Sequence, residues 1–387
     1  MSQSKFKATN LLAGTALVAL GVAFAGQVSA KDHARVIKSG KDQVSLSISG
    51  HVSRQITIVD DGRTSVRHSD SDFSSSRIVL KGKGKVNSDL SVATKIETAV
   101  DDNRNNPGRA DLEFGGRSGN DLQTRKAEIS LKHKSFGTVW MGAGDAATNG
   151  ITEISFVSYA FLPGFVGGVN GGAFRGVSTG DGNGDQITAV NDVTGQQDGL
   201  GRSTRIRYDT PVIAGFMASA SHLDDQSWDV ALRYSGKVMG TKIKGGLGFS
   251  NDSTDEQLAA TIALQHSSGL GAHYGISYVN DETRNGEGSA DASTGTEDPL
   301  HQSAQLFYTS KFNEMGKTQF VYEYSRTDHK RASGDKADAH SVAMAQNIDA
   351  AAMEMILRFT TVEFNNDALT LDNDSVNSLS LHTRVKF

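Results

Sequence analysis

The chain has 387 residues, of which 42 are glycine, 4 are proline and none is cysteine, and its formal net charge is −5. A scaffold held together by disulfides is therefore excluded. The most apolar stretch beyond residue 30, around Ile151–Val169, is interrupted by Glu153, Pro163 and several glycines, which excludes a helical membrane protein. Many glycines with few prolines favour numerous strands joined by tight turns over a soluble α/β enzyme.

The first thirty residues are typical of a secretory signal peptide. Two lysines near the start are followed by the mostly apolar Leu11–Ala25 and by Val28–Ala30, a small-residue cleavage site. The apolar run is short for a transmembrane helix, which needs about 20 residues. We therefore expect residues 1–30 to be a cleaved signal peptide and residues 31–387 to be the mature domain.

Beyond residue 30, polar and apolar residues alternate along most of the chain. In Val44–Ile58 the even positions are apolar, apart from Gly50 and Arg54, and in Leu379–Phe387 one face is apolar and the other is polar. Patterns of period two predict strands with one apolar and one polar face. Other clear examples are residues 77–81, 90–100, 127–131, 205–209, 228–235, 242–249, 258–265, 272–278, 319–325 and 353–360.

With weaker segments near residues 137–141, 216–222, 304–310 and 341–347, we count roughly sixteen strands, as in transmembrane barrels. Short links, such as residues 132–137 and 267–269, alternate with long polar links, such as 60–75, 101–122 and 280–300. The prediction is an all-β fold, a transmembrane antiparallel β-barrel with an apolar outside and a polar inside. A closed barrel leaves no free edge, so residues 44–58 are expected to pair with residues 379–387.

A secreted β-sandwich or adhesin would also alternate. The final Phe387 and the Tyr and Trp residues near strand ends favour the barrel, because aromatic residues gather at both membrane interfaces. Arg54 lies on the apolar parity of its strand, where a bare arginine facing lipid costs about 2–4 kcal/mol. We expect Arg54 to lie at a subunit interface or near the lipid headgroups.

Nearly sixty residues between the strands expected at 138–142 and 202–209 show little alternation, and a loop of that length is usually functional. Within it, Gly142–Ala147 matches a dinucleotide fingerprint, but no βαβ unit follows. Asp181, Asn183 and Asp185 have the oxygen spacing of a calcium loop, with Gln186 where that loop needs glycine. The calcium loop is therefore a weak candidate site, beside the simpler interpretation of a solvated loop. We expect no other metal and no cofactor.

Several segments resemble the general diffusion porins of the Gram-negative outer membrane. The similarity covers Ser75–Gly82 with Val86–Leu90, Thr124–Leu131 with Phe136–Val139, Arg202–Pro211 with Ala214–Phe216, and the terminal strand. Each motif is moderately specific, and their order along the chain makes the set specific. The resemblance implies a sixteen-stranded barrel, a homotrimer, and a constriction loop folded into the lumen, where acids on the loop face bases on the wall.

Carried over by position, this resemblance implies a functional role for three sets of residues. The basic wall would contain His51, Arg77, Arg125 and Arg202, with Arg205 and Arg207 as further inward-facing candidates. The loop acids would be Asp145 and Glu153, because Leu162–Gly167 has Gly164 where many relatives have an acid. Barrel closure and assembly would use Leu381, Val385 and Phe387.

Arg125 presents a difficulty, because it shares the odd parity of Ala127, Ile129 and Leu131, which are apolar and should face lipid. A β-bulge, or a position above the membrane band, would explain an inward-facing Arg125.

The resemblance also implies passive diffusion of small polar solutes and ions, without catalysis. Expected partners are outer-membrane lipid and lipopolysaccharide, the barrel-assembly machinery through the C-terminal strand, and no nucleic acid. One alternative is a channel selective for a sugar or an organic acid, lined by Tyr159, Phe161 and Phe165. Less favoured alternatives are a barrel adhesin or a barrel hydrolase.

Overall fold

A computed structural model describes residues 35–38, 44–71, 73–100, 122–158, 161–166, 169, 172–176, 186–196, 198–252, 255–281, 297–367, 369 and 371–387. The expected signal peptide, the calcium-loop candidates Asp181, Asn183 and Asp185, and Tyr159 lie outside these residues. None of the helices in the described ranges is long and apolar enough to cross a membrane.

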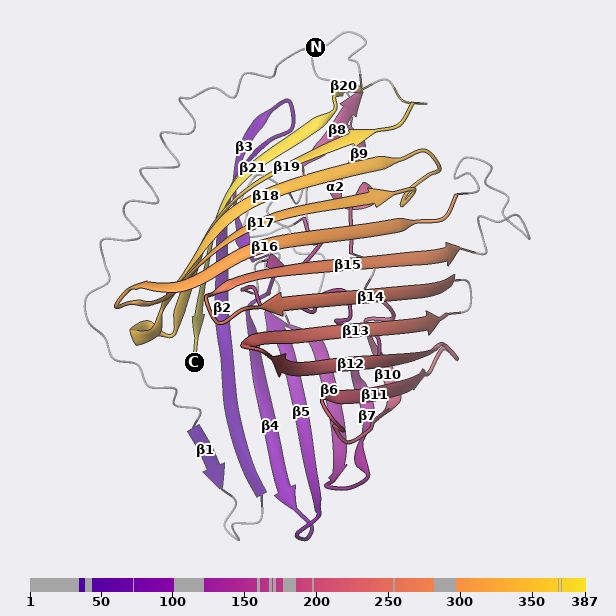
Figure 1. Cartoon of the computed structure of the whole chain (residues 1–387), viewed down its shortest axis with the longest axis vertical. Helices are drawn as coiled ribbons and strands as arrows, with labels where there is room; N and C mark the ends of the chain where they lie inside the picture. Colours follow the sequence, from indigo (N-terminus) through magenta and orange to yellow (C-terminus); the bar gives the residue numbers. More distant parts are fainter. Residues whose placement is uncertain are drawn as a thin grey trace.

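The fold is a closed antiparallel β-barrel of sixteen strands, as the alternation predicts, and β3 and β4 together occupy one strand position (Figure 1). The first half of the barrel contains β2 (Val44–Asp60), β3 (Thr64–Asp70), β4 (Arg77–Lys85), β5 (Leu90–Val100), β6 (Leu122–His133), β7 (Gly137–Asp145), β10 (Arg202–Asp209), β11 (Phe216–Leu223) and β12 (Trp228–Val238). The second half contains β13 (Thr241–Asn251), β14 (Asp255–Gln265), β15 (Leu270–Asp281), β16 (Leu300–Asn313), β17 (Gly316–Asp328), β18 (Lys336–Ile348), β19 (Met353–Asn365) and β21 (Ser375–Lys386).

The seam between β2 and β21 closes the barrel. Val52 lies opposite Val385 and Ile56 lies opposite Leu381. The backbone of Phe387 exchanges two hydrogen bonds with Gly50, of 2.9 and 3.0 Å. A short strand, β1 (Arg35–Lys38), pairs with the remaining length of β2 beyond this point. The predicted pairing of the first and last strands is therefore confirmed.

Side chains alternate between a buried inner face and an exposed outer face. In β2, Ser53, Gln55 and Thr57 are buried, whereas Val52 is 52% exposed. Other apolar side chains on the outer face, such as Leu306 at 61% exposed, behave in the same way. An apolar outer surface around a polar interior suits a barrel surrounded by lipid.

Short turns join the strands at the end of the barrel where the chain terminates, which we call the short-turn end. At Gly137 (φ +87°) and Gly269 (φ +97°), a Cβ atom would lie 2.1 Å from a neighbouring backbone oxygen, so both turns require glycine. Close by, the ring of Phe312 lies 6.1 Å from that of Tyr308 and 5.9 Å from that of Phe320. These exposed rings fit one of the aromatic belts expected of a membrane barrel.

The region predicted as a long link, residues 60–75, is structured differently. Only Asp61–Arg63 form a turn, and β3 then pairs with the second half of β2 while β4 pairs with the first half. Thus β3 and β4 together complete one strand of the barrel, and a break that includes residues 71 and 73–76 separates them. The prediction was wrong because the polar residues 64–70 alternate too weakly in hydropathy to indicate a strand. The break turns Phe73 inward, where its ring lies 4.9 Å from the ring of His382.

Residues 146–201, which connect β7 to β10, form what we call the inserted segment. Its described part lies against the inner face of the barrel, where it contributes to three apolar clusters with β12 and β14, with β16, β17 and β19, and with β18, β19 and β21. It also contains β8 (Ala173–Gly176), β9 (Gln186–Ala189) and α2 (Val190–Val193). These elements lie near the long-link ends of β17–β21, where β8 pairs with β20 (Leu371–Asn373) (Figure 1).

Candidate functional site: a charged wall opposite the inserted segment

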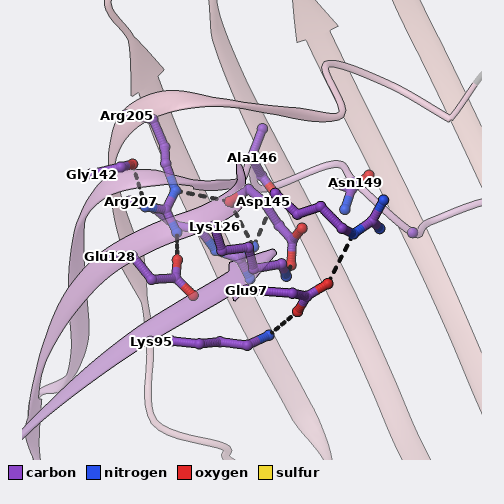
Figure 2. Close-up of polar contacts among 12 residues, drawn as sticks. Lys95, Glu97, Lys126, Glu128, Gly142, Asp145, Ala146, Asn149, Arg205 and Arg207 are labelled. Carbon is purple, nitrogen blue, oxygen red and sulfur yellow. Dashed lines mark hydrogen bonds and ion pairs between the residues drawn. The ribbon is translucent and has the colours of Figure 1, made fainter. Parts of the chain in front are cut away.

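Three bases surround one carboxylate on the inner face of β4, β5 and β6. Glu97 accepts a 2.9 Å hydrogen bond from Arg77 and another of 2.9 Å from Arg125, and its second oxygen lies 2.7 Å from Lys95 Nζ. Figure 2 shows the contact between Lys95 and Glu97, which both lie on β5. One acid with three bases leaves this part of the wall with a net positive charge.

A β-bulge explains how Arg125 reaches this cluster. Glu97 pairs with Lys126, and the next residue, Thr98, pairs with Thr124, so Arg125 is an extra residue in β6. The bulge reverses the side-chain parity, which lets both Arg125 and Lys126 point inward. This is one of the two explanations that the sequence left open for Arg125.

A second group of charges holds the start of the inserted segment. Lys126 pairs with Asp145 at the end of β7. Arg205 bonds to Glu128 at 2.5 Å, to the carbonyl oxygen of Gly142 at 2.7 Å and to that of Asp145 at 3.0 Å (Figure 2). These bonds hold the main chain of β7 in place immediately before the inserted segment begins.

Arg207 acts in the same place. It donates to the carbonyl oxygen of Ala146 at 2.9 Å and binds Asp209 at 2.8 Å. Arg205, at 4% exposed, and Arg207 therefore face inward, as their parity indicates, but they position the segment and are engaged by carbonyls and carboxylates.

Two other residues predicted for the basic wall flank the Glu97 cluster. His51 lies between Lys386 and Arg77 in the strand register, and its ring is within hydrogen-bond distance of Ser75 O at 3.0 Å and of Ser74 Oγ at 3.1 Å. Arg202 is the register partner of Asp145, and it lies within electrostatic range of Arg125 and Glu153. The structure thus brings His51, Arg77, Arg125 and Arg202 to one side of the lumen.

The inserted segment carries two carboxyl groups, Glu153 and Asp198, that interact electrostatically. Glu153 accepts a 2.9 Å hydrogen bond from Gln196. Asp198 accepts hydrogen bonds from the main chain of Gly150 at 2.7 Å and of Thr152 at 3.1 Å, and from the Thr152 hydroxyl at 2.6 Å. Burial raises the pKa of Glu153, and burial together with Glu153 raises the pKa of Asp198 to about 7.

Asp198 was not predicted from the sequence, because it lies in a stretch without any periodic pattern. Its hydrogen bonds join the outgoing part of the segment, at residues 150–152, to the returning part near residue 198. An acid four residues before the start of a strand gives no sequence signal for such a bridge.

Farther along, main-chain groups of the segment bind inward-facing side chains of successive strands. The nitrogen of Thr148 donates to Asp229 at 2.7 Å, the carbonyl oxygen of Phe161 accepts from Gln305 at 2.8 Å, and that of Phe165 accepts from Arg358 at 3.2 Å. Further bonds of this kind come from Lys244 to the Ser155 carbonyl at 3.2 Å and from Arg233 to the Asn149 carbonyl at 2.9 Å. The segment is thus held along β12–β19, away from the wall formed by β4–β6.

Arg358 is the most deeply buried basic side chain among these anchors. Its guanidinium lies 3.3 Å from Glu323 and within 5.7 Å of the centres of the Phe73 and Phe161 rings. Phe161 is only 1% exposed, and the ring of Phe165 lies 5.3 Å from that of Phe73. Both aromatic residues therefore pack the segment against the barrel.

The structure also explains the glycine at position 164. Its φ angle is +71°, and a Cβ atom there would lie 2.1 Å from His301 Nε2. A side chain cannot be accommodated, so an acid is impossible at this point without a rearrangement. An acid of the barrel wall, Glu323, interacts instead with the Gly164 main chain.

Comparison with known proteins gives a consistent result. The family model described as Gram-negative porin matches residues 13–353. The fold is similar to an anion-selective porin from Comamonas acidovorans, with 15% identity over 89% of this chain and 100% of that chain and a TM-score of 0.59. It is also similar to the trimer form of OmpT, an outer membrane protein of Vibrio cholerae, with 13% identity over 89% and 100% of the two chains and a TM-score of 0.56.

A third similar structure is the outer membrane channel DcaP of Acinetobacter baumannii, with 12% identity over 91% of this chain and 99% of that chain and a TM-score of 0.56. No curated protein matches the chain.

Proposed function

Since the chain belongs to the Gram-negative porin family and forms an outer-membrane diffusion channel, we propose that it works as a homotrimer that passes small hydrophilic solutes and ions by passive diffusion. Transport of this kind needs no chemical step and no cofactor. We also propose that residues 1–30 are removed on export and that the β2–β21 seam is the part that the barrel-assembly machinery recognises. Outer-membrane lipid and lipopolysaccharide then surround the apolar outer face.

One observation carries the proposal for the pore. The inserted segment covers the inner face of β12–β19, whereas the Glu97 cluster on β4–β6 carries three bases and no bond to the segment among those described. We therefore place the narrowest part of the lumen between this wall and the side of the segment that bears Glu153. Fixed charges of both signs beside a narrow aqueous path orient polar solutes and disfavour apolar ones.

The proposed trimer rests on the outer surface and on a relative. The similar OmpT structure is described as a trimer form. In this chain Arg54 is exposed on the outer face of β2, directly opposite Asp70 of β3 in the strand register. A charged side chain in the middle of an apolar outer face is better accommodated at a protein–protein contact than in lipid.

Recording from single channels in planar bilayers tests the proposal. We expect conductance that closes in three equal steps, grows with salt concentration and shows weak ion selectivity, because three wide aqueous pores enter together. A barrel that inserts but remains silent would contradict the channel and favour an adhesin. Binding of one sugar or organic acid that blocks the current would favour the selective channel instead.

A further inference from the structure

Three lysines follow one another on the inner face of β4, between the Glu97 cluster and the short-turn end. Arg77 points inward to Glu97, and the register of β4 with β2 and β5 is unbroken from Arg77 to Gly84. Alternation therefore places Lys81, Lys83 and Lys85 on the same inner face as Arg77. Ile78, on the opposite parity, is 44% exposed on the outer face.

The neighbours of these lysines are polar but do not neutralise them. Lys81 lies opposite Ser47 on β2 and opposite Lys95 on β5, and Lys83 lies opposite Ser45. Like charges directly opposite each other destabilise a sheet. Lys95 is compensated by Glu97, whereas within the described part of the chain Lys81, Lys83 and Lys85 make no ion pair.

The position of the lysines connects them to the charged wall. The row begins two strand positions below Glu97, since Glu97 pairs with Val79 and Lys95 pairs with Lys81. Lys132 of β6 lies opposite Ser91, which in turn lies opposite Lys85, and it adds a further charge near the short-turn end. The described part of the inserted segment binds β12–β19, so it leaves this row uncovered.

From these contacts we propose that Lys81, Lys83 and Lys85, with the hydroxyls of Ser45 and Ser47, form a binding track for polyvalent oxyanions such as phosphorylated solutes. Alternate side chains on a strand are about 7 Å apart, so an anion with two or more charged groups can engage two lysines at once, whereas chloride engages one. Hydroxyl donors beside ammonium groups suit the oxygen atoms of phosphates. The track deepens the proposed function and rests on it, because it requires an open pore.

Block of the channel by pyrophosphate tests the track. Purified trimer is inserted into a planar bilayer in about 0.1 M KCl, where the screening length is about 10 Å, and pyrophosphate is added to each side in turn. We expect block that is stronger from the short-turn side and that largely disappears in about 1 M salt, where the screening length falls to about 3 Å. In the triple variant K81Q/K83Q/K85Q, the pyrophosphate concentration that gives half block should rise about tenfold, because three exposed charge contacts are lost together.

A matched control separates the track from the general charge of the pore mouth. K237Q/K242Q/K317Q removes three lysines of inward parity at the same end of the barrel, from β12, β13 and β17. We expect this control to leave half block within about twofold of the unmodified protein, since exposed charges farther away than a screening length act weakly. If block by pyrophosphate weakened equally in both triple variants, or in neither, the proposed track would be overturned.

Two further results complete the test. If the triple variant does not assemble, the single substitution Lys83→Gln should still weaken block about twofold, and no change would count against the track. An unmodified trimer that conducts without any response to pyrophosphate also overturns it and leaves the channel function intact. A trimer that does not conduct contradicts the proposed function itself.

Discussion

The covered and the open parts of the inner wall have opposite chemistry, although both come from strands with the same alternation. Beneath the inserted segment, inward positions hold buried small or apolar residues such as Ala231, Ala259 and Ile356, interspersed with anchors such as Asp229 and Arg358. On β4–β6 the inward positions hold many bases, among them Arg77, Lys81, Lys83, Lys95 and Lys126, together with the acids Glu97 and Glu128. Whether an inward-facing position of the barrel is apolar or charged thus depends on whether it packs against protein or faces water.

Removing the most deeply buried basic anchor, Arg358, should disturb the covered wall most. Arg358→Leu leaves Glu323 buried without its ion pair, and losing one partner of a buried pair costs about 3–5 kcal/mol. We expect a lower midpoint of thermal unfolding, noisier conductance and faster proteolysis within residues 146–200. As a control, Arg326→Leu removes a partly exposed ion pair on the outer face of β17 and should change the midpoint much less. Equal effects of the two substitutions would show that Arg358 does not anchor the inserted segment.

Reversing one charge of the open wall should change selectivity without changing stability to the same extent. Arg125→Glu places a second carboxylate beside Glu97, and two unit charges a few ångströms apart interact by about 1 kcal/mol in water, equivalent to roughly fivefold. The ratio of potassium to chloride permeability, measured from the reversal potential in a KCl gradient, should rise by about that factor. If the ratio does not move, the Glu97 cluster does not face the conducting path.

The carboxyl pair of the inserted segment should make the covered wall sensitive to pH. The pKa of Asp198 is raised to about 7 from an ordinary 3.8, so its contribution to stability is complete below pH 3.8 and is lost as the pH rises through about 7. Amide hydrogen exchange of residues 148–152 should be faster at pH 8 than at pH 5, after correction for intrinsic exchange, by at least about tenfold, the equivalent of one pKa unit.

Asp198→Asn should abolish this pH dependence, because an amide accepts similar hydrogen bonds but carries no charge. Glu153, the partner of Asp198, and the charged groups near Glu153, which are Asp145, Arg125 and Arg202, all remain in the variant. A pH profile that survives the substitution would assign the effect to Glu153 instead.

The smallest effect is expected on the outside of the barrel. Arg54→Leu should lower the temperature at which the trimer dissociates in detergent by an amount equivalent to about 1 kcal/mol, the typical value of an exposed charge contact. Arg54→Lys retains the charge and serves as the control. A more stable trimer after substitution by leucine would place Arg54 against lipid rather than against a neighbouring subunit.

Alternation in the sequence was sufficient to predict the barrel, its closure by the first and last strands and the inward face of most strands. It could not predict what covers each face, because inward residues such as Asp229 and Arg358 alternate like all the others and become anchors only when the inserted segment reaches them. Arg125 was ambiguous for a related reason, since one extra residue in β6 reverses the parity on which the prediction depended. Asp198 and the break between β3 and β4 lie where no periodic pattern exists.

Phe73, at the break between β3 and β4, has a mechanical consequence. Its ring contacts Phe165 in the middle of the inserted segment, while Arg205 and Arg207 hold the beginning of the segment and Asp198 joins its return to its start. A chain fixed at several points along its length bends much less than one attached at a single end. The segment therefore cannot move as a rigid body about one hinge. The width of the narrowest part of the lumen can change only if strands of the barrel wall shift with the segment.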